Sequence, residues 1–110
     1  MEFRCNQVGD SIVLAVKGRM DVTSSPRFEK ECLTWLDKGQ ARIVADLSGL
    51  EYISSAGLRS ILVVGKRLKA QGGGLSLCGL SGMVKDVVTV SGFATIFPIH
   101  DTVDKALGKS

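Results

Sequence analysis

Two adjacent serines, Ser54 and Ser55, are the residues of this chain whose type and position most directly suggest chemistry. They follow a predicted apolar strand and a short loop, and they open a helical pattern. The first N–H groups of a helix lack partners within the helix, and the helix dipole places partial positive charge there. A phosphoryl group on such a hydroxyl would lie in a favourable field. The position therefore predicts a phosphorylation site or a serine that caps the helix.

The glycine run Gly72–Gly74 and the single histidine, His100, are two further candidates for chemistry. A nucleotide-binding loop precedes a helix and carries Lys-Ser/Thr at fixed spacing, whereas this run follows a helix and precedes a strand, which predicts a turn. His100 has no Gly-x-Ser-x-Gly nucleophile motif to work with. We therefore expect no catalytic residue, and the chain is predicted to be a non-enzyme without a cofactor.

The three cysteines, Cys5, Cys32 and Cys78, are far apart and form no Cys-x-x-Cys pair. A metal site would also need histidines, and the chain has one. We therefore expect no metal site. The cysteines are predicted to be small, buried apolar residues in a reducing cytoplasm.

Length and composition indicate one compact domain over residues 1–110, with 45% hydrophobic and 23% charged residues. The net charge of +3 is mild and no basic run exceeds two residues, which argues against a nucleic-acid partner. Lys66, Arg67 and Lys69 are expected to form an ordinary solvated helix face. No apolar run is long enough to cross a bilayer and the N-terminus lacks an apolar signal core, which predicts a cytoplasmic protein without a membrane partner. A monomer is the default expectation at this size.

Hydrophobic periodicity predicts an alternation of strands and helices in the order β-β-α-β-α-β-α-β-α. The predicted strands are Phe3–Val8, Ser11–Lys17, Ala41–Leu47, Leu75–Cys78 and Ile96–Ile99. The predicted helices run from Ser24-Ser25-Pro26 to Gly39, from Ser54 to Lys69, from Met83 to Val90, and from Asp101 or Thr102 through Leu107. This order implies a mixed, mainly parallel α/β sheet with right-handed crossovers.

Four details of this pattern are specific enough to test. The second strand is apolar on both faces, which predicts a central strand covered on both sides. Pro98 within the last strand predicts a sheet edge. Trp35 is expected to be half-buried against the core, with partner contact as the alternative. The last residues, Gly108 to Ser110, are expected to be frayed.

Five short motifs occur in an order and spacing that resemble the STAS domain family, the bacterial anti-sigma factor antagonists. They are Gly18-Arg19-Met20-Asp21, Asp46-Leu47-Ser48, Ile53 to Leu58, Gln71-Gly72-Gly73-Gly74 and Val90-Ser91-Gly92-Phe93. The likeness covers nearly the whole chain. It implies a STAS-type mixed, mainly parallel sheet of about five strands with about four helices.

The resemblance also places the two serines in a register. The family segment commonly reads Asp-Ser-Ser/Thr-Gly-Leu, with the serine after the aspartate as phosphate acceptor. Here Ser54 takes the aspartate position, Ser55 the acceptor position and Ala56 the second hydroxyl position, followed by Gly57 and Leu58. The resemblance therefore implies phosphorylation of Ser55, with Ser54 as the alternative acceptor or the cap. The absence of the acidic residue bears on kinase choice and phosphorylation efficiency.

The family implies a partner-switching regulator, for instance of transcription. The unphosphorylated domain binds an anti-sigma factor of the serine-kinase class, the kinase phosphorylates the acceptor with ATP, the complex weakens, and a phosphatase resets the cycle. The partner-binding residues implied here are Asp21, Ser54, Ser55, Ala56, Gly57, Leu58 and Arg59. Asp21 is equally expected to bond within its own loop, and Gly57 is favoured as a packing residue. The alternatives are a constitutive STAS scaffold that binds partners without phosphorylation, and a small-ligand binding module.

Overall fold

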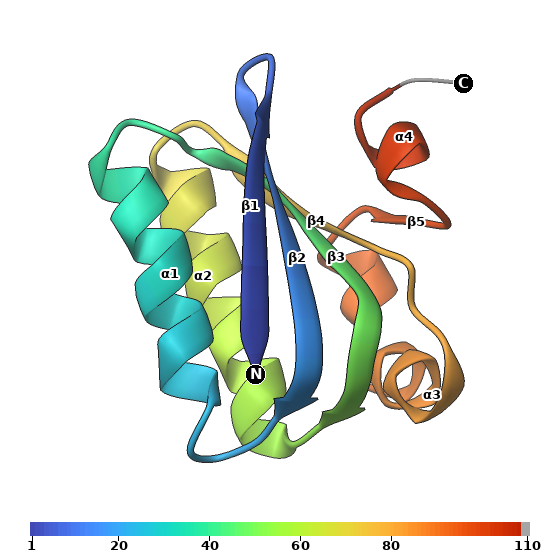
Figure 1. Cartoon of the computed structure of the whole chain (residues 1–110). Helices are drawn as coiled ribbons and strands as arrows, with labels where there is room; N and C mark the ends of the chain where they lie inside the picture. The colour runs from blue at the N-terminus through green and yellow to red at the C-terminus, as the bar shows by residue number, and fades with distance from the viewer. Residues whose placement is uncertain (109–110) are drawn as a thin grey trace.

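A computed structural model describes residues 1–108 of the chain as a five-stranded sheet flanked by helices (Figure 1). The strands lie in the spatial order β1-β2-β3-β4-β5, with β1 antiparallel to β2 and every other pair parallel. This confirms the mixed, mainly parallel sheet. The elements are β1 Glu2–Val8, β2 Ser11–Met20, α1 Ser25–Asp37, β3 Arg42–Ile53, α2 Ser55–Ala70, β4 Gly74–Cys78, α3 Gly82–Val90, η1 Phe93–Thr95, β5 Ile99–His100 and α4 Val103–Ala106.

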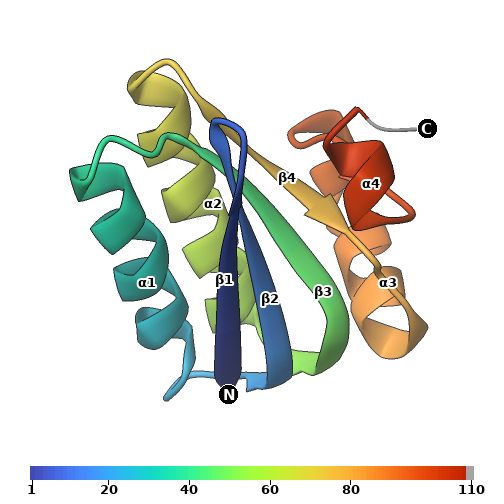
Figure 2. The ribbon, with the colours of Figure 1, turned by 45° about the horizontal axis from the view of Figure 1, so that its top comes forward.

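The main core lies between the sheet and the pair α1 and α2, which run side by side along one face (Figures 1 and 2). Strand residues alternate between the two faces of a sheet. On β2, Ile12, Leu14 and Val16 point into this core, whereas Val13 points to the opposite face. There Val13 joins a smaller cluster that α4 covers at one end of the sheet.

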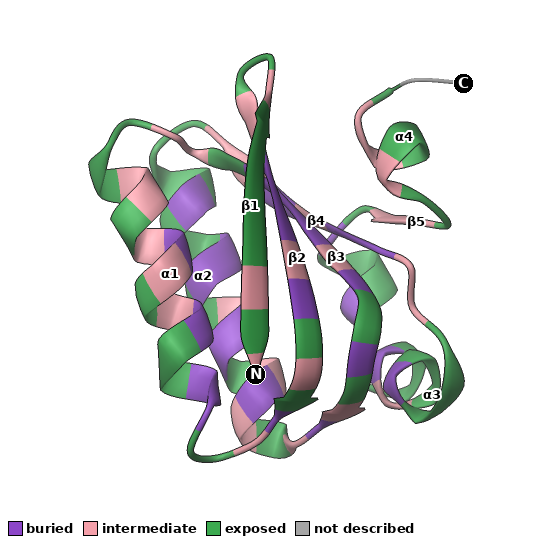
Figure 3. Ribbon diagram, in the orientation of Figure 1, coloured by how far each residue is buried: buried purple, intermediate pink, exposed green. Residues whose placement is uncertain are grey.

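The predicted central position of the second strand is confirmed, but its cover is unequal. On the face of α1 and α2 the side chains of Ile12, Leu14, Val16 and Met20 are buried, and Figure 3 shows buried bands along the strand in purple. On the opposite face Val13 is buried, Ala15 is half-buried and Lys17 is exposed. The prediction that both faces of the strand are covered is therefore correct only near its start. The helix on the second face, α4, spans only four residues, Val103–Ala106.

The third strand is longer than predicted and overturns the expected loop before the serines. It runs from Arg42 to Ile53, because β2 also continues to Met20 and pairs with the added residues. The last of these pairs joins Met20 to Ile53. Two irregularities in the register interrupt the ladder, so the pairing bends without ending. Ser54 therefore follows directly on a sheet strand.

The last strand was predicted at the wrong residues. Residues 93–95 form a 3₁₀ helix, and the strand comprises only Ile99 and His100. Pro98 precedes this strand, and its carbonyl accepts a hydrogen bond of 2.9 Å from the N–H of Leu77. The edge position predicted from the proline is confirmed, since β5 is the outermost strand.

Two smaller expectations about side chains have different outcomes. Cys32 and Cys78 are buried as predicted, but Cys5 is exposed because it lies on the edge strand β1. Trp35 is half-buried as predicted, and its indole N–H donates to the Cys5 sulfur at 3.3 Å. Of the expected frayed end, Gly108 is in a turn, and residues 109–110 lie outside the described part of the chain. None of the helices within residues 1–108 is long and apolar enough to span a membrane.

Candidate phosphorylation and partner-binding site

Ser54 is the N-cap of α2, and its hydrogen-bonding groups are occupied. Its backbone is extended, with φ −96° and ψ 174°, and its side-chain oxygen accepts a bond of 3.3 Å from the N–H of Gly57. Its own N–H donates to the carbonyl of Met20 at 2.9 Å. The expectation that Ser54 is the cap is confirmed. The carbonyl of Met20 therefore ties the start of α2 to the end of β2.

Ser55 is the first residue of α2, and its side chain is exposed. Within residues 1–108 its hydroxyl makes no hydrogen bond, in contrast to the hydroxyl of Ser54. The alternative that Ser55 is the cap is wrong, because Ser54 fills that role. An exposed and unengaged hydroxyl at the positive end of a 16-residue helix can receive a phosphoryl group without breaking any contact.

Gly57 allows the helix to lie close to the two strands that precede it. A β-carbon at this position would come 2.7 Å from Cγ1 of Ile53 and 3.1 Å from the carbonyl oxygen of Met20. The first distance would force the Ile53 side chain to shift, and the second is tighter than most β-carbon contacts. Gly57 is buried, as the packing interpretation predicted, and acts by positioning. Of its neighbours, Ala56 and Leu58 are half-buried and Arg59 is exposed.

The Asp21 loop is closed by the side chain of Asp21 itself. Its Oδ1 accepts bonds from the hydroxyl of Thr23 at 2.8 Å and from the N–H groups of Thr23 and Ser24 at 3.1 and 3.0 Å. The Thr23 hydroxyl, followed by the Ser24 groups, lowers the pKa of Asp21 from 3.8 to about 2. The predicted bonding within its own loop is therefore what the structure shows. The Ser24 hydroxyl donates to the carbonyl of Arg19 and leaves α1 without a side-chain cap.

The structure brings the Asp21 loop and the serines together at one end of the sheet. Asp21 follows Met20, whose carbonyl holds Ser54, so the two predicted segments are neighbours. Between them the structure adds residues that the sequence did not single out. Val22 at the loop is 73% exposed, and the Arg19 guanidinium stacks on the Tyr52 ring at 4.2 Å.

A shallow depression of about 450 Å³ opens beside the Asp21 loop. Its polar lining comes from Arg19, Asp21, Thr23, Ser24, Arg27 and Glu51. Glu51 belongs to the unpredicted half of β3, so only pairing with β2 could have revealed it. The Gly18-to-Asp21 motif contains Arg19 and could have indicated it as a residue of this site, although only Asp21 was predicted from that motif.

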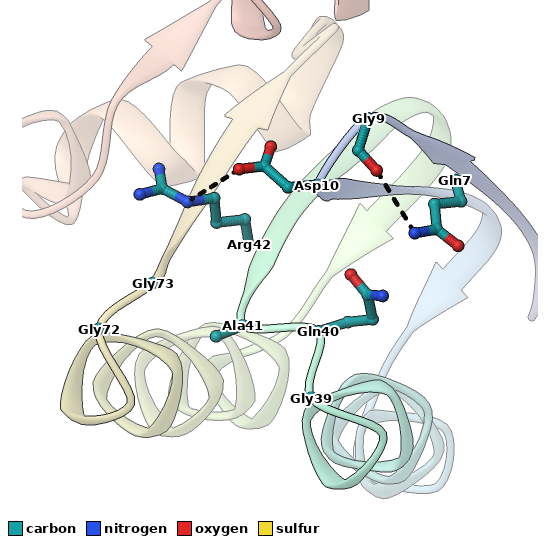
Figure 4. A pocket seen from close by; sticks show the side chains of 9 residues that line it. All are labelled: Gln7, Gly9, Asp10, Gly39, Gln40, Ala41, Arg42, Gly72 and Gly73. Atoms are coloured by element: carbon teal, nitrogen blue, oxygen red, sulfur yellow. Dashed lines mark hydrogen bonds and ion pairs between the residues drawn. The ribbon is translucent and has the colours of Figure 1, made fainter.

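The glycine run lines a second depression at the opposite end of the sheet (Figure 4). Its two charged residues, Arg42 and Asp10, pair with each other at 3.8 Å. A β-carbon on Gly73 would overlap the carbonyl group of Ala41, and the N–H of Gly74 donates to that carbonyl at 2.9 Å. The predicted turn is confirmed: Gly72 lies in it with a φ of 83°, and Gly73 is needed for the close approach to Ala41. Within residues 1–108 no three His, Cys, Asp or Glu side chains lie together as a metal site.

The sheet order, with a serine pair at the start of α2, agrees with the fold that the motifs imply. Residues 3–106 match the STAS domain family, and the chain belongs to that family. It is 36% identical over 106 residues to BtrV of Bordetella bronchiseptica, named as a candidate anti-sigma factor antagonist; the match covers 96% of this chain and 91% of that protein.

Solved structures show the same fold. A crystal structure of a candidate anti-sigma factor antagonist from Thermotoga maritima has a TM-score of 0.91 and 26% identity, covering 96% of this chain and 92% of that one. The phosphorylated form of the Bacillus cell fate determinant SpoIIAA has a TM-score of 0.76 at 20% identity, and the match covers 97% of both chains. The second likeness extends to the fold alone.

Proposed function

We propose that this chain is an anti-sigma factor antagonist that acts in the cytoplasm by partner switching at Ser55. The unphosphorylated domain binds an anti-sigma factor of the serine-kinase class, and phosphorylation of Ser55 releases it. A serine phosphatase restores the binding form. The observation that carries the proposal is the contrast between the two serines, since Ser54 is engaged as the cap and Ser55 is exposed without a bond.

Phosphorylation at Ser55 would change the surface without rearranging the fold. A phosphate adds about −1.5 to −2 charges at neutral pH, and the start of α2 can hold it locally. In a packed interface the added charge must be desolvated, and it repels acidic groups of the partner. A coupling of about 1–3 kcal/mol, typical of regulatory sites, changes affinity by about 5- to 150-fold.

The proposed partner surface comprises the Asp21 loop and the start of α2. Val22 and Arg59 supply its exposed side chains, together with Ser55. Ser54 and Gly57 position the start of α2, on which this surface lies. Relatives named as anti-sigma factor antagonists support the proposed class of partner, an anti-sigma factor.

A constitutive scaffold of the same fold is the second candidate. Ser54 stands where the family commonly has an acidic residue, and a neutral hydroxyl engaged in capping cannot orient the acceptor as a carboxylate would. In this case the same surface binds its partner irrespective of Ser55.

The proposal is tested by capture of partners from native lysate with wild type, Ser55→Ala and Ser55→Asp. Thr89→Asp is the matched control, because it adds the same charge at an exposed position of α3. We expect a serine-kinase-like protein with wild type, Ser55→Ala and Thr89→Asp, and its loss with Ser55→Asp. Incubation of the recovered kinase with ATP should add a phosphate-sized mass to wild type and none to Ser55→Ala. Equal capture by all four proteins, without phosphate transfer, would establish the scaffold.

A further inference from the structure

Helix α2 holds an unusual share of the charge of the molecule. It contains Arg59, Lys66, Arg67 and Lys69 and no acidic residue, so its charge is +4. The whole chain has a net charge of +3, and the remainder therefore sums to 3 − 4 = −1. All four side chains are exposed. The net positive charge of the molecule is thus accounted for by one helix, although other cations, balanced by acidic residues, lie elsewhere.

These four cations are also unpaired, which is the second observation. Within residues 1–108 the ion pairs are Arg42 with Asp10 and Lys105 with Asp101, and neither involves α2. Three other cations lie on aromatic rings, namely Arg19, Arg27 and Lys38. No side-chain hydrogen bond within residues 1–108 uses a cation of α2, whose buried hydroxyl at Ser60 instead bonds Glu29 on α1 at 2.7 Å.

The spacing of three of these cations places them in line with Ser55, whereas Arg67, 12 residues after Ser55, lies at the flank of the row. Arg59, Lys66 and Lys69 follow Ser55 by 4, 11 and 14 residues, so they lie on the same side of the helix. The half-buried Leu62, seven residues after Ser55, completes the row, and Val63 beside it is 36% exposed. The exposed side of α2 is therefore a basic ridge with an apolar middle, and it begins at Ser55.

We propose that this ridge, formed by Ser55, Arg59, Leu62, Val63, Lys66, Arg67 and Lys69, docks an acidic surface of a protein partner. Unpaired cations around an apolar centre match the polar rim and apolar core of protein interfaces. A nucleic acid would favour a broader basic surface, and the ridge carries no aromatic side chain for stacking. A membrane would need a free apolar helix face, and that of α2 is buried in the core.

The ridge also gives the proposed switch an electrostatic mechanism, and this step rests on the proposed function. A phosphate on Ser55 would reduce the charge of the ridge from +4 to roughly +2. It would lie one helical turn from Arg59, a spacing at which opposite charges attract. The Arg59 guanidinium would then turn to the phosphate and away from the partner. Release follows from lost attraction as well as from repulsion.

The test uses poly-L-glutamate as a defined acidic polypeptide and maps its binding on the wild-type chain by amide chemical shifts. We expect shifts concentrated on residues 55–70, and an affinity that falls steeply as salt rises from about 20 to about 200 mM. Lys66→Glu with Lys69→Glu should lower the affinity at least about tenfold. Arg4→Glu with Lys30→Glu is the matched control, because it makes the same charge change at exposed positions outside α2 and should lower it less than about threefold.

Several outcomes would overturn the docking surface. The first is an equal loss of poly-L-glutamate affinity in the two double variants, and the second is a set of amide shifts spread over all basic residues. The third is binding to phosphatidylglycerol vesicles or to a DNA duplex that is tighter than binding to poly-L-glutamate. The switch is read separately, with chain carrying phosphoserine at position 55. Weaker poly-L-glutamate binding by that chain supports the electrostatic mechanism. Unchanged binding, with the Lys66→Glu and Lys69→Glu effect intact, upholds the ridge and overturns the electrostatic mechanism, whereas the phosphorylation switch itself fails only if Ser55→Asp retains its partner in the capture experiment.

Discussion

Two neighbouring serines with the same side chain have different surroundings, and this difference defines the site at the residue scale. The Ser54 hydroxyl bonds the N–H of Gly57, whereas the Ser55 hydroxyl is exposed. An N-cap hydroxyl satisfies a helix N–H that would otherwise lack a protein partner. Ser54 therefore contributes to stability, and Ser55 is available for modification.

We expect Ser54→Ala to lower the free energy of unfolding by about 1 kcal/mol, because the cap of α2 is lost. Ser55→Ala, the matched control, should change it by less than about 0.5 kcal/mol, since it removes an exposed group without a partner. Urea denaturation of both variants measures the difference. Equal losses would contradict the assignment of the cap to Ser54.

The Asp21 carboxylate predicts an acid-dependent contribution to stability. Its pKa is about 2 in the folded chain and higher when unfolded, because the Thr23 and Ser24 donors stabilise the charged form. The contribution is therefore complete above the unfolded value and is lost as pH falls through about 2. The stability difference between wild type and Asp21→Asn should be largest near about pH 5 and shrink towards about pH 2.

Urea midpoints measured across this range test the sign of the effect. Asp86→Asn is the control, because Asp86 is exposed on α3 and makes no side-chain bond within residues 1–108. It should leave the pH profile of wild type unchanged. A difference for Asp21→Asn that grows on acidification would show that the loop does not hold the charged carboxylate.

At the scale of elements, the entry into β4 depends on close contact between two chain segments. Gly73 leaves no room for a β-carbon beside the Ala41 carbonyl, whereas nothing lies within 4 Å of a β-carbon at Gly74. The two adjacent glycines therefore differ in what they require. At Gly73 the missing β-carbon permits the contact that sets the register of β3 and β4. At Gly74 a β-carbon would meet no other atom.

We expect Gly73→Ala to destabilise the fold by about 1–3 kcal/mol, because the added methyl group displaces the Ala41 carbonyl from its bond with the N–H of Gly74. Gly74→Ala is the matched control and should cause no loss greater than about 0.5 kcal/mol. Thermal unfolding of the two variants provides the comparison. A Gly73→Ala protein as stable as wild type would show that this turn can open without cost.

At the scale of the whole molecule, the sheet buries its two faces to different degrees. Helices α1 and α2 seal one face, and the short α4 covers only the end of the other, over Val44 and Cys78. The three cysteines lie in three different places with respect to these two faces. Cys5 lies exposed on the edge strand, Cys32 lies in the main core, and Cys78 lies under α4.

A thiol reagent should therefore modify one cysteine in the native protein and all three in denaturant. Partial burial and the neighbouring Glu31 raise the pKa of Cys5, so its reaction should accelerate with rising pH. Burial raises the pKa of Cys78 to about 11, which further slows the reaction of this cysteine with the reagent. The Cys5→Ser variant serves as the control, and the reagent should modify neither of its two cysteines in the native state. Rapid native labelling of Cys78 would show that α4 opens readily.

Sequence reasoning predicted the local features of this protein because short segments determine them. Helical spacing predicted α2, Gly72–Gly74 predicted a turn, and the serine pair predicted a capped helix start. The order of strands and helices then restricted the sheet to mainly parallel pairing. The family resemblance, carried by motif order, is confirmed by the match over residues 3–106.

Only the tertiary structure decided the features that depend on distant partners. β3 extends to Ile53 because β2 pairs with it, and the polar side chain of Ser60 is buried against Glu29 of α1. The same pairing sets the Asp21 loop beside Ser54, and neither ion pair within residues 1–108 involves a cation of α2. Backbone pairing and burial arise between segments far apart in the chain, so local patterns determine the elements and their assembly determines the surface they form.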